Sequence, residues 1–180
     1  MTDAEPAGAN EKKPAANARE IKALAHPLRL RILRLCGLHE LTNKQLADRL
    51  GQDPGTMLYH VRQLLSTGFL EPAEVRRGDS GALEKPYRST GRSWTLDTAL
   101  REAGSGGPLA PVEAFREELA EAGSDALASL SRFVLHLSEE DAADLITRIG
   151  AVLNEYTDSD RQRSDQPAYG GIFVLHRSPD

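Results

Sequence analysis

Three polar side chains, Thr56, Tyr59 and Arg62, have a spacing that could bind nucleic acid. They recur at every third position, so a helix would carry them along one side. Hydroxyl and guanidinium groups can donate hydrogen bonds to phosphates and to base edges in a major groove. An ordinary amphipathic helix with a solvated polar face has the same pattern, so the flanking elements have to decide between the two interpretations.

The residues around this stripe predict two short helices joined by a tight turn. Thr42 can cap the first helix, with Gln45 completing a capping box, and Gly51 is placed to end it. Asp53 as N-cap and Pro54 at the first helical position predict the start of the second helix, which carries the stripe. The apolar residues expected to bury the two helices are Leu46, Ala47, Leu50, Met57, Val61 and Leu64. The pattern is that of a helix-turn-helix.

The residues that follow predict a β-hairpin wing. Gly68 is placed to stop the helix, residues 69–70 begin an extended segment, and the turn-rich residues 76–86 lead to expected strands at 87–90 and 93–96. A loop directly after a recognition-type helix favours DNA contact over simple solvation of its charges. The residues expected to contact DNA lie on the two motif helices and the wing: Lys44, Gln45, Thr56, Leu58, Tyr59, Arg62, Arg76, Arg77, Lys85 and Arg88.

Four stretches in this order resemble the winged helix of ArsR/SmtB-type bacterial transcriptional regulators. They are LAHPLRLRIL (24–33), LTNKQLADRLG (41–51), MLYHVRQLLSTGFLE (57–71) and KPYRST (85–90). The resemblance implies a homodimeric DNA-binding repressor whose second motif helix enters the major groove, and helices flanking the winged helix that build the dimer interface. A homodimer would act on a palindromic operator.

Charge is distributed unevenly along the 180 residues, whose formal net charge is −5. Residues 19–92 carry 13 basic and 8 acidic side chains, net +5, whereas residues 95–180 carry 7 and 16, net −9. This asymmetry fits a DNA-facing domain joined to an acidic module. A domain of +5 is only modestly basic, so a dimer that doubles the phosphate contacts is expected.

The first half begins with a tail and two helices. Residues 1–17 have no apolar period and are expected to be disordered, whereas residues 18–25 and 27–36 have helical patterns. Several side chains here have structural interpretations. His26 is expected to cap a helix, His60 and Cys36 to pack in the interior, and Arg31 and Arg34 to be solvated.

The second half predicts a separate module. Residues 101–111, with three Gly and two Pro, are expected to be a linker. Residues 112–130 have helical spacing, with Gly123 as a weak point or break, and are expected to contribute to a dimer interface or to pack on their own subunit. Residues 132–137 and the final GIFVLHRS alternate as strands around a helix capped by Ser138. This β-α-β unit is too small to be stable alone, so pairing across a dimer or docking on the preceding helix is expected. An effector pocket and a pure oligomerisation element are equally compatible with it.

Other functions find little support in the sequence. The sequence contains no Cys-x-Cys cluster, and the helix expected at a dimer interface has no His/Asp pair, so the usual metal-sensing sites are not predicted. His39 has no ligand partner nearby. A nonstandard site formed by His136 and His176 is the remaining metal hypothesis. No nucleotide, hydrolase or metalloprotease motif is present, so neither an enzyme nor a cofactor is predicted. With no long apolar run and no signal-peptide pattern, the cytoplasm is expected and a membrane is not.

The expected fold is mainly α with a small β component (α+β). Residues 1–17 form the tail, 18–100 a winged helix-turn-helix, 101–111 a linker and 112–180 a helix plus a β-α-β dimerisation or effector module. The expected function is sequence-specific transcription regulation on double-stranded DNA. The alternatives are a protein-interaction module that uses the winged helix as a dimer scaffold, and a regulator with a nonstandard metal or small-molecule trigger.

Overall fold

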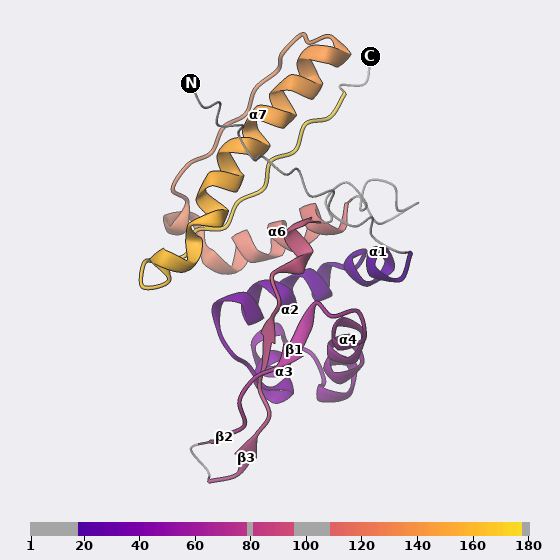
Figure 1. Cartoon of the computed structure of the whole chain (residues 1–180), viewed down its shortest axis with the longest axis vertical. Helices are drawn as coiled ribbons and strands as arrows, with labels where there is room; N and C mark the ends of the chain where they lie inside the picture. The colour runs from indigo at the N-terminus through magenta and orange to yellow at the C-terminus, as the bar shows by residue number, and fades with distance from the viewer. Residues whose placement is uncertain (1–17, 79–80, 96–108, 178–180) are drawn as a thin grey trace, which may run out of the picture. The chain divides into compact units, whose positions relative to one another are not determined.

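The computed structural model describes residues 18–78, 81–95 and 109–177 (Figure 1). The predicted tail at 1–17 and most of the predicted linker, residues 101–108, lie outside the described residues. The chain divides into two compact units, Met1–Glu118 and Leu119–Asp180. None of the described helices is both long and apolar enough to cross a membrane.

Four helices form the body of the first unit, at the places that the sequence predicts. They are α1 (Ala18–Leu24), α2 (Pro27–Leu38), α3 (Asn43–Leu50) and α4 (Pro54–Ser66). The start of α3 has the predicted capping box, because Thr42 accepts from the backbone of Gln45 and donates its own backbone N–H to the Gln45 side chain. Gly51 ends α3 in the left-handed conformation, with φ 61°. These local signals account for the helix boundaries.

The core of the first unit lies where α2, α3 and α4 pack together under the wing. Phe69 is fully buried and closes the core from the residue before the first strand. His60 and Cys36 are buried as predicted, and burial raises the pKa of the Cys36 thiol to about 12. The other buried apolar side chains of this core are Ala23, Leu24, Ile32, Leu33, Leu41, Leu46, Ala47, Leu50, Met57, Val61, Leu64 and Leu70.

The wing is a long hairpin of two short antiparallel pairs. Strand β1 (Leu70–Pro72) pairs with β4 (Tyr87–Ser89), and farther out β2 (Arg76–Arg77) pairs with β3 (Leu83–Glu84). Leu41 also bridges to Tyr87, which fixes the base of the wing to the α2–α3 connection. The unit is therefore α+β, as predicted.

The expected strand at 93–96 is wrong for its described residues. A 3₁₀ turn, η1 (Arg92–Thr95), takes its place. Arg92 explains the change, because its guanidinium bonds to Glu20 at 2.8 Å and to the Thr67 carbonyl at 3.3 Å. A side chain that reaches back to α1 and the end of α4 turns the chain away from the hairpin.

Helix α6 (Ala110–Ala122) ends at the glycine that the sequence marks as a weak point or break. The helical spacing continues to residue 130, but Gly123 has a φ of 79° and only the short 3₁₀ turn η2 (Ser124–Ala126) follows. A left-handed glycine ends an α-helix, and the residues after it do not restart one.

The solvated interpretation of two α2 arginines is also wrong. Arg31 forms an ion pair with Glu117 at 2.6 Å, and its side chain is only 8% exposed. Arg34 pairs with Glu118 at 2.8 Å. Both partners lie on α6, about 85 residues away in sequence, so the ion pairs tie the start of this helix to α2.

The second unit contains one long helix, α7 (Glu139–Asp158), followed by the 3₁₀ turn η3 (Asp160–Arg163). The predicted Ser138 cap is confirmed, with its hydroxyl accepting from the Asp141 backbone. The predicted strands are not: residues 127–137 and 167–177 form no strand among the described residues. Two segments of this length with one helix make too small a sheet to be stable within a single chain.

Candidate nucleic-acid interface

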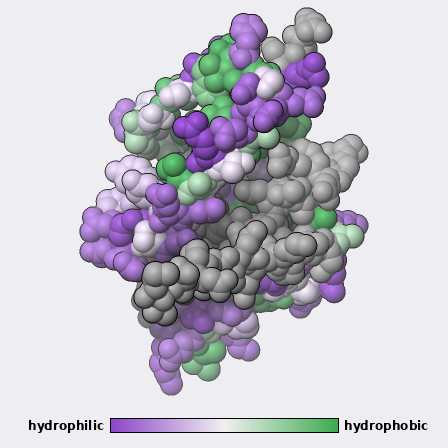
Figure 2. All heavy atoms as spheres, turned by 45° about the horizontal axis from the view of Figure 1, so that its top comes forward, coloured by the Kyte–Doolittle hydropathy of each residue, from purple (hydrophilic) through white to green (hydrophobic). Residues whose placement is uncertain are grey.

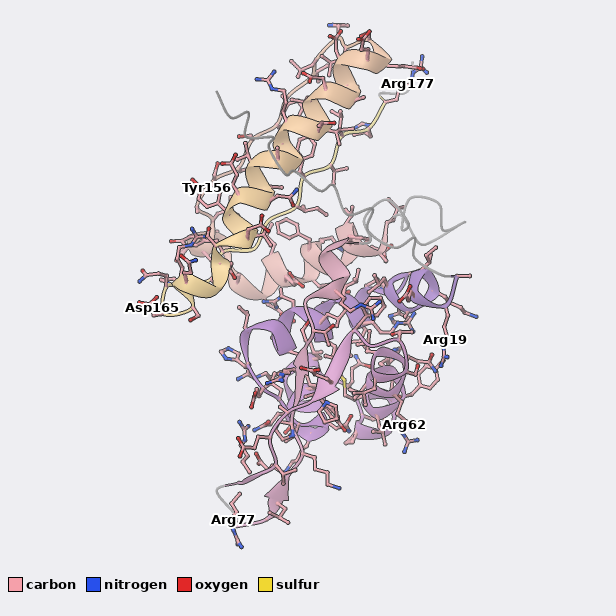
Figure 3. All side chains as sticks on the ribbon, in the orientation of Figure 1. Arg19, Arg62, Arg77, Tyr156, Asp165 and Arg177 are labelled. Carbon is pink, nitrogen blue, oxygen red and sulfur yellow. The ribbon has the colours of Figure 1, made fainter. Side chains whose placement is uncertain are left out.

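Helix α4 presents the three stripe residues on the outside of a helix that the core holds in place. Thr56, Tyr59 and Arg62 are exposed, with Tyr59 58% exposed, while Met57 and Val61 between them are fully buried. Figure 3 shows Arg62 projecting from α4 away from the body of the first unit. The face that the sequence predicted for recognition is therefore the face left open to a partner.

The start of α4 is fixed by two polar contacts. Asp53 accepts hydrogen bonds from the backbone of Gly55 at 2.9 Å and of Thr56 at 3.0 Å. Hydrogen bonds from Thr56, from its side chain first and its backbone second, hold the pKa of Asp53 below its ordinary value. Asn43 on α3 donates to the Pro54 carbonyl at 2.9 Å, so the two helices of the motif share a joint. These bonds set the angle at which α4 would approach DNA.

The remaining residues expected on the two helices divide by exposure. Lys44 is exposed on α3, where an ammonium can reach a phosphate. The oxygen of Gln45 already accepts from the Thr42 backbone at 2.9 Å, so this side chain stabilises the helix start. Leu58 is half-buried.

Two of the cationic side chains of the wing form ion pairs, and two are exposed without one among the described residues. Arg76 bonds to Glu84 at 3.1 Å, and Arg88 bonds to Glu71 at 2.7 Å across the β1–β4 pair. The hydrogen bond to Glu71 raises the pKa of Arg88 above its ordinary value. Arg77 and Lys85 are exposed and have no ion pair among the described residues; Figure 3 shows Arg77 on the outer part of the wing. Open cations cost less to move onto a phosphate than cations that must first leave a carboxylate.

Two histidines couple α4 to the start of α2. The ring of His26, which caps α2 by accepting from Leu28 at 3.2 Å, lies 4.6 Å from the ring of His60. Burial, with Arg29 as a smaller cause, lowers the pKa of His26. Burial, followed by the charges of His26 and Arg29, lowers the pKa of His60. The two rings therefore support α4 from behind its exposed face.

Sequence reasoning missed one positioning residue, Arg92. Besides its bonds to Glu20 and Thr67, its guanidinium lies 5.8 Å from the centre of the Phe69 ring. Gly68 makes room for it: the φ there is 70°, and a Cβ would come within 2.8 Å of the guanidinium. No local pattern marks Arg92, because all its partners come from distant elements.

The described residues form no cluster of metal-ligating side chains. Residues 18–78, 81–95 and 109–177 contain no group of three His, Cys, Asp or Glu side chains close enough to hold a metal ion. His136 and His176 are both exposed.

Comparison with known proteins identifies the part of the chain that carries the motif. Residues 24–73 match the family model of a helix-turn-helix domain, so the prediction of this motif is confirmed. A search of curated proteins finds no match. Among solved structures, the chain is similar to a homodimeric winged helix-turn-helix DNA-binding domain of Mycobacterium bovis, described as a possible ArsR-family transcriptional regulator. That similarity has 24% identity over 67% of this chain and 86% of the other, with a TM-score of 0.37, too low to support an argument.

Proposed function

We propose that this chain, whose residues 24–73 are a helix-turn-helix domain, is an ArsR-type transcription regulator that binds double-stranded DNA as a homodimer. The observation that carries the proposal is the exposed stripe of Thr56, Tyr59 and Arg62 on a helix fixed by a core and two polar joints. In this proposal α4 lies in the major groove, and Thr56, Tyr59 and Arg62 contact bases or the adjacent backbone.

The other contacts would position the domain. Lys44, Arg77 and Lys85 bind phosphates, since they are exposed cations at the edges of the recognition helix. Arg76 and Arg88 would contribute after exchanging a glutamate for a phosphate, and Gln45 and Leu58 would act by contact with the backbone and sugar. A two-fold homodimer would place two copies of α4 on a palindromic operator, where it acts as a repressor in the cytoplasm.

The proposal is tested by fluorescence anisotropy on genomic fragments that include the chain's own upstream region, across a salt series. Sequence-preferring binding that weakens steeply with salt is expected. Arg62→Ala should weaken specific binding by about 1–3 kcal/mol and leave nonspecific binding nearly unchanged, whereas Arg77→Ala should weaken binding to all sequences alike.

Arg148→Ala is the matched control, since Arg148 is an exposed arginine of the other unit with a side chain 78% exposed. It should bind DNA as the unaltered chain does. A folded chain on which Arg62→Ala and Arg148→Ala have the same effect would overturn the recognition role of α4.

A second candidate function is a protein-interaction module that uses the winged helix as a scaffold. The exposed apolar side chains of residues 127–177 favour it, because large apolar surfaces commonly contact other proteins. It predicts a folded oligomer that binds none of the fragments at any salt concentration, the opposite of the regulator.

A further inference from the structure

The second unit has no interior of its own. None of its described residues from 119 to 177 is buried, although it carries many apolar side chains (Figure 2). Those that are most exposed include Leu130 at 82%, Val134 at 80% and Tyr169 at 81%. An apolar surface of this kind is stabilised when another surface covers it.

The two extended segments of this unit also leave their backbone unpaired. Residues 128–137 and 167–177 run along α7, one before it and one after it (Figure 1). Within the described part of the chain, no backbone hydrogen bond joins either segment to another. Unpaired N–H and C=O groups in extended chain are ready to pair with another strand.

The apolar residues of both segments differ in exposure from one position to the next. Phe133, Leu135 and Leu137 are 47%, 55% and 39% exposed, against 80% for Val134 between them. In the second segment Phe173 and Leu175 are half-buried while Val174 is exposed. The less exposed apolar side chains of each segment therefore lie on one side of it, and the half-buried residues of α7 are Ala142, Leu145, Ile149 and Gly150. The two segments and α7 are arranged like two strands beside a helix, but neither segment has a neighbouring strand to pair with among the described residues.

We propose that the partner is a second copy of this chain, and that residues 132–137 of the two copies pair antiparallel about a two-fold axis at Leu135. This inference deepens the proposed homodimer. In this register Phe133 lies opposite Leu137 of the partner subunit, so Phe133, Leu135 and Leu137 of both copies share one face. Residues 171–176, which repeat the FVLH sequence, supply the outer strands. Four strands with two α7 helices on one face reach the size at which a sheet becomes stable.

Charge complementarity supports the second copy as the occupant. Arg132 begins the pairing residues 132–137, and the acidic first turn of α7, with Glu139, Glu140 and Asp141, follows their end. Antiparallel pairing brings each Arg132 beside the acidic turn of the other copy. A two-fold interface has to be complementary to itself, and this segment satisfies that condition in both its apolar face and its charged ends.

Cysteine cross-linking of the full chain tests the register. Residues directly opposite have Cα atoms about 4.5–5.5 Å apart, within reach of a disulfide. Leu135→Cys should therefore form a covalent dimer on oxidation with diamide. Val134→Cys is the matched control, because in this register its two copies are offset along the strands and too far apart. The native Cys36 is buried and gives little background.

A proline test addresses the hydrogen bonds. Val134→Pro should lower the dimer affinity at least tenfold in sedimentation equilibrium, since proline removes a bond from an inner strand. Leu130→Pro, in the same extended stretch but outside the pairing, should leave the affinity unchanged. In amide exchange, residues 132–137 should become protected as protein concentration raises the dimer fraction.

The outcomes separate this inference from the proposed function. A chain that binds DNA as a dimer with no Leu135→Cys cross-link, or with protection of residues 132–137 that is independent of concentration, overturns the pairing and leaves the regulator intact. A chain that cross-links at Leu135 and binds no DNA supports the pairing and overturns the regulator.

Discussion

Helices α4 and α7 are both amphipathic and both begin at a polar cap, yet only α4 is buried along one face. Met57, Val61 and Leu64 of α4 are fully buried, whereas α7 has no buried residue. In the first unit α2, α3 and the first strand of the wing pack against α4, while the second unit offers α7 only two extended segments. An apolar stripe therefore specifies what a helix needs, and the number of neighbouring elements determines whether one chain can supply it.

The largest expected effect comes from removing the same side chain from each helix. Leu64→Ala should lower the free energy of unfolding by about 2–5 kcal/mol, because it leaves a cavity in a packed core. Leu153→Ala, at a position 56% exposed, should change it by less than about 0.5 kcal/mol in the single chain. Urea unfolding followed by circular dichroism measures both. Equal losses at every protein concentration would show that the second unit has a core of its own.

An intermediate effect is expected from ion pairs. Glu117→Gln should destabilise the first unit by about 1–3 kcal/mol, since it removes a carboxylate that lies 2.6 Å from the nearly buried Arg31 guanidinium. Asp144→Asn removes the partner of Arg148 on α7, a pair 3.6 Å apart with both side chains well exposed, and should cost less than about 0.5 kcal/mol. Thermal unfolding of the two variants compares them directly. Similar melting temperatures would mean that the link between α2 and α6 is not a stabilising one.

The smallest effect is expected from pH and is confined to the first unit. The pKa values of His26 and His60 are lowered, so the folded state favours the neutral rings and the unfolded state binds protons at a higher pH. Stability is therefore full above the ordinary histidine pKa of about 6.5 and decreases as pH falls below it. Arg29 and Tyr59 are the other polar groups at these rings; Arg29 adds to the lowering of both histidine pKa values. Thermal unfolding at about pH 7.5 and 5.5 measures the loss.

His26→Asn is the control for this pH dependence. Asparagine is a good N-cap and does not titrate, so the variant should keep the start of α2 and lose part of the pH dependence. An unchanged difference between the two pH values would exclude the ring pair as its source.

Local chemistry was enough to predict most of the first unit. The capping box at Thr42, the Asp53–Pro54 start and the left-handed Gly51 each act within four residues, so they can be recognised without a structure. The periods of α3 and α4 also identified the buried residues. The stripe of Thr56, Tyr59 and Arg62 was predicted for the same reason, because positions three apart must share a helix face.

Other features depended on contacts that no window of sequence contains. Arg31 and Arg34 resemble ordinary surface arginines until α6 brings Glu117 and Glu118 to them. Arg76 and Arg88 are expected to contact DNA, and the sequence does not show their pairing with Glu84 and Glu71, because that pairing depends on strand register. Arg92 replaced a predicted strand through bonds to α1 and α4.

The helix-turn-helix, its caps and its exposed stripe can therefore be predicted from the sequence, since these follow from hydrogen bonds and periodicities within a few residues. The fold of the whole chain is needed to know which arginines are paired and that residues 132–137 and 171–176 have no strand partners within the described part of one chain. Alternation marks a segment that can become a strand, but a strand exists only when another backbone supplies its hydrogen bonds, and that partner is not written in the segment itself.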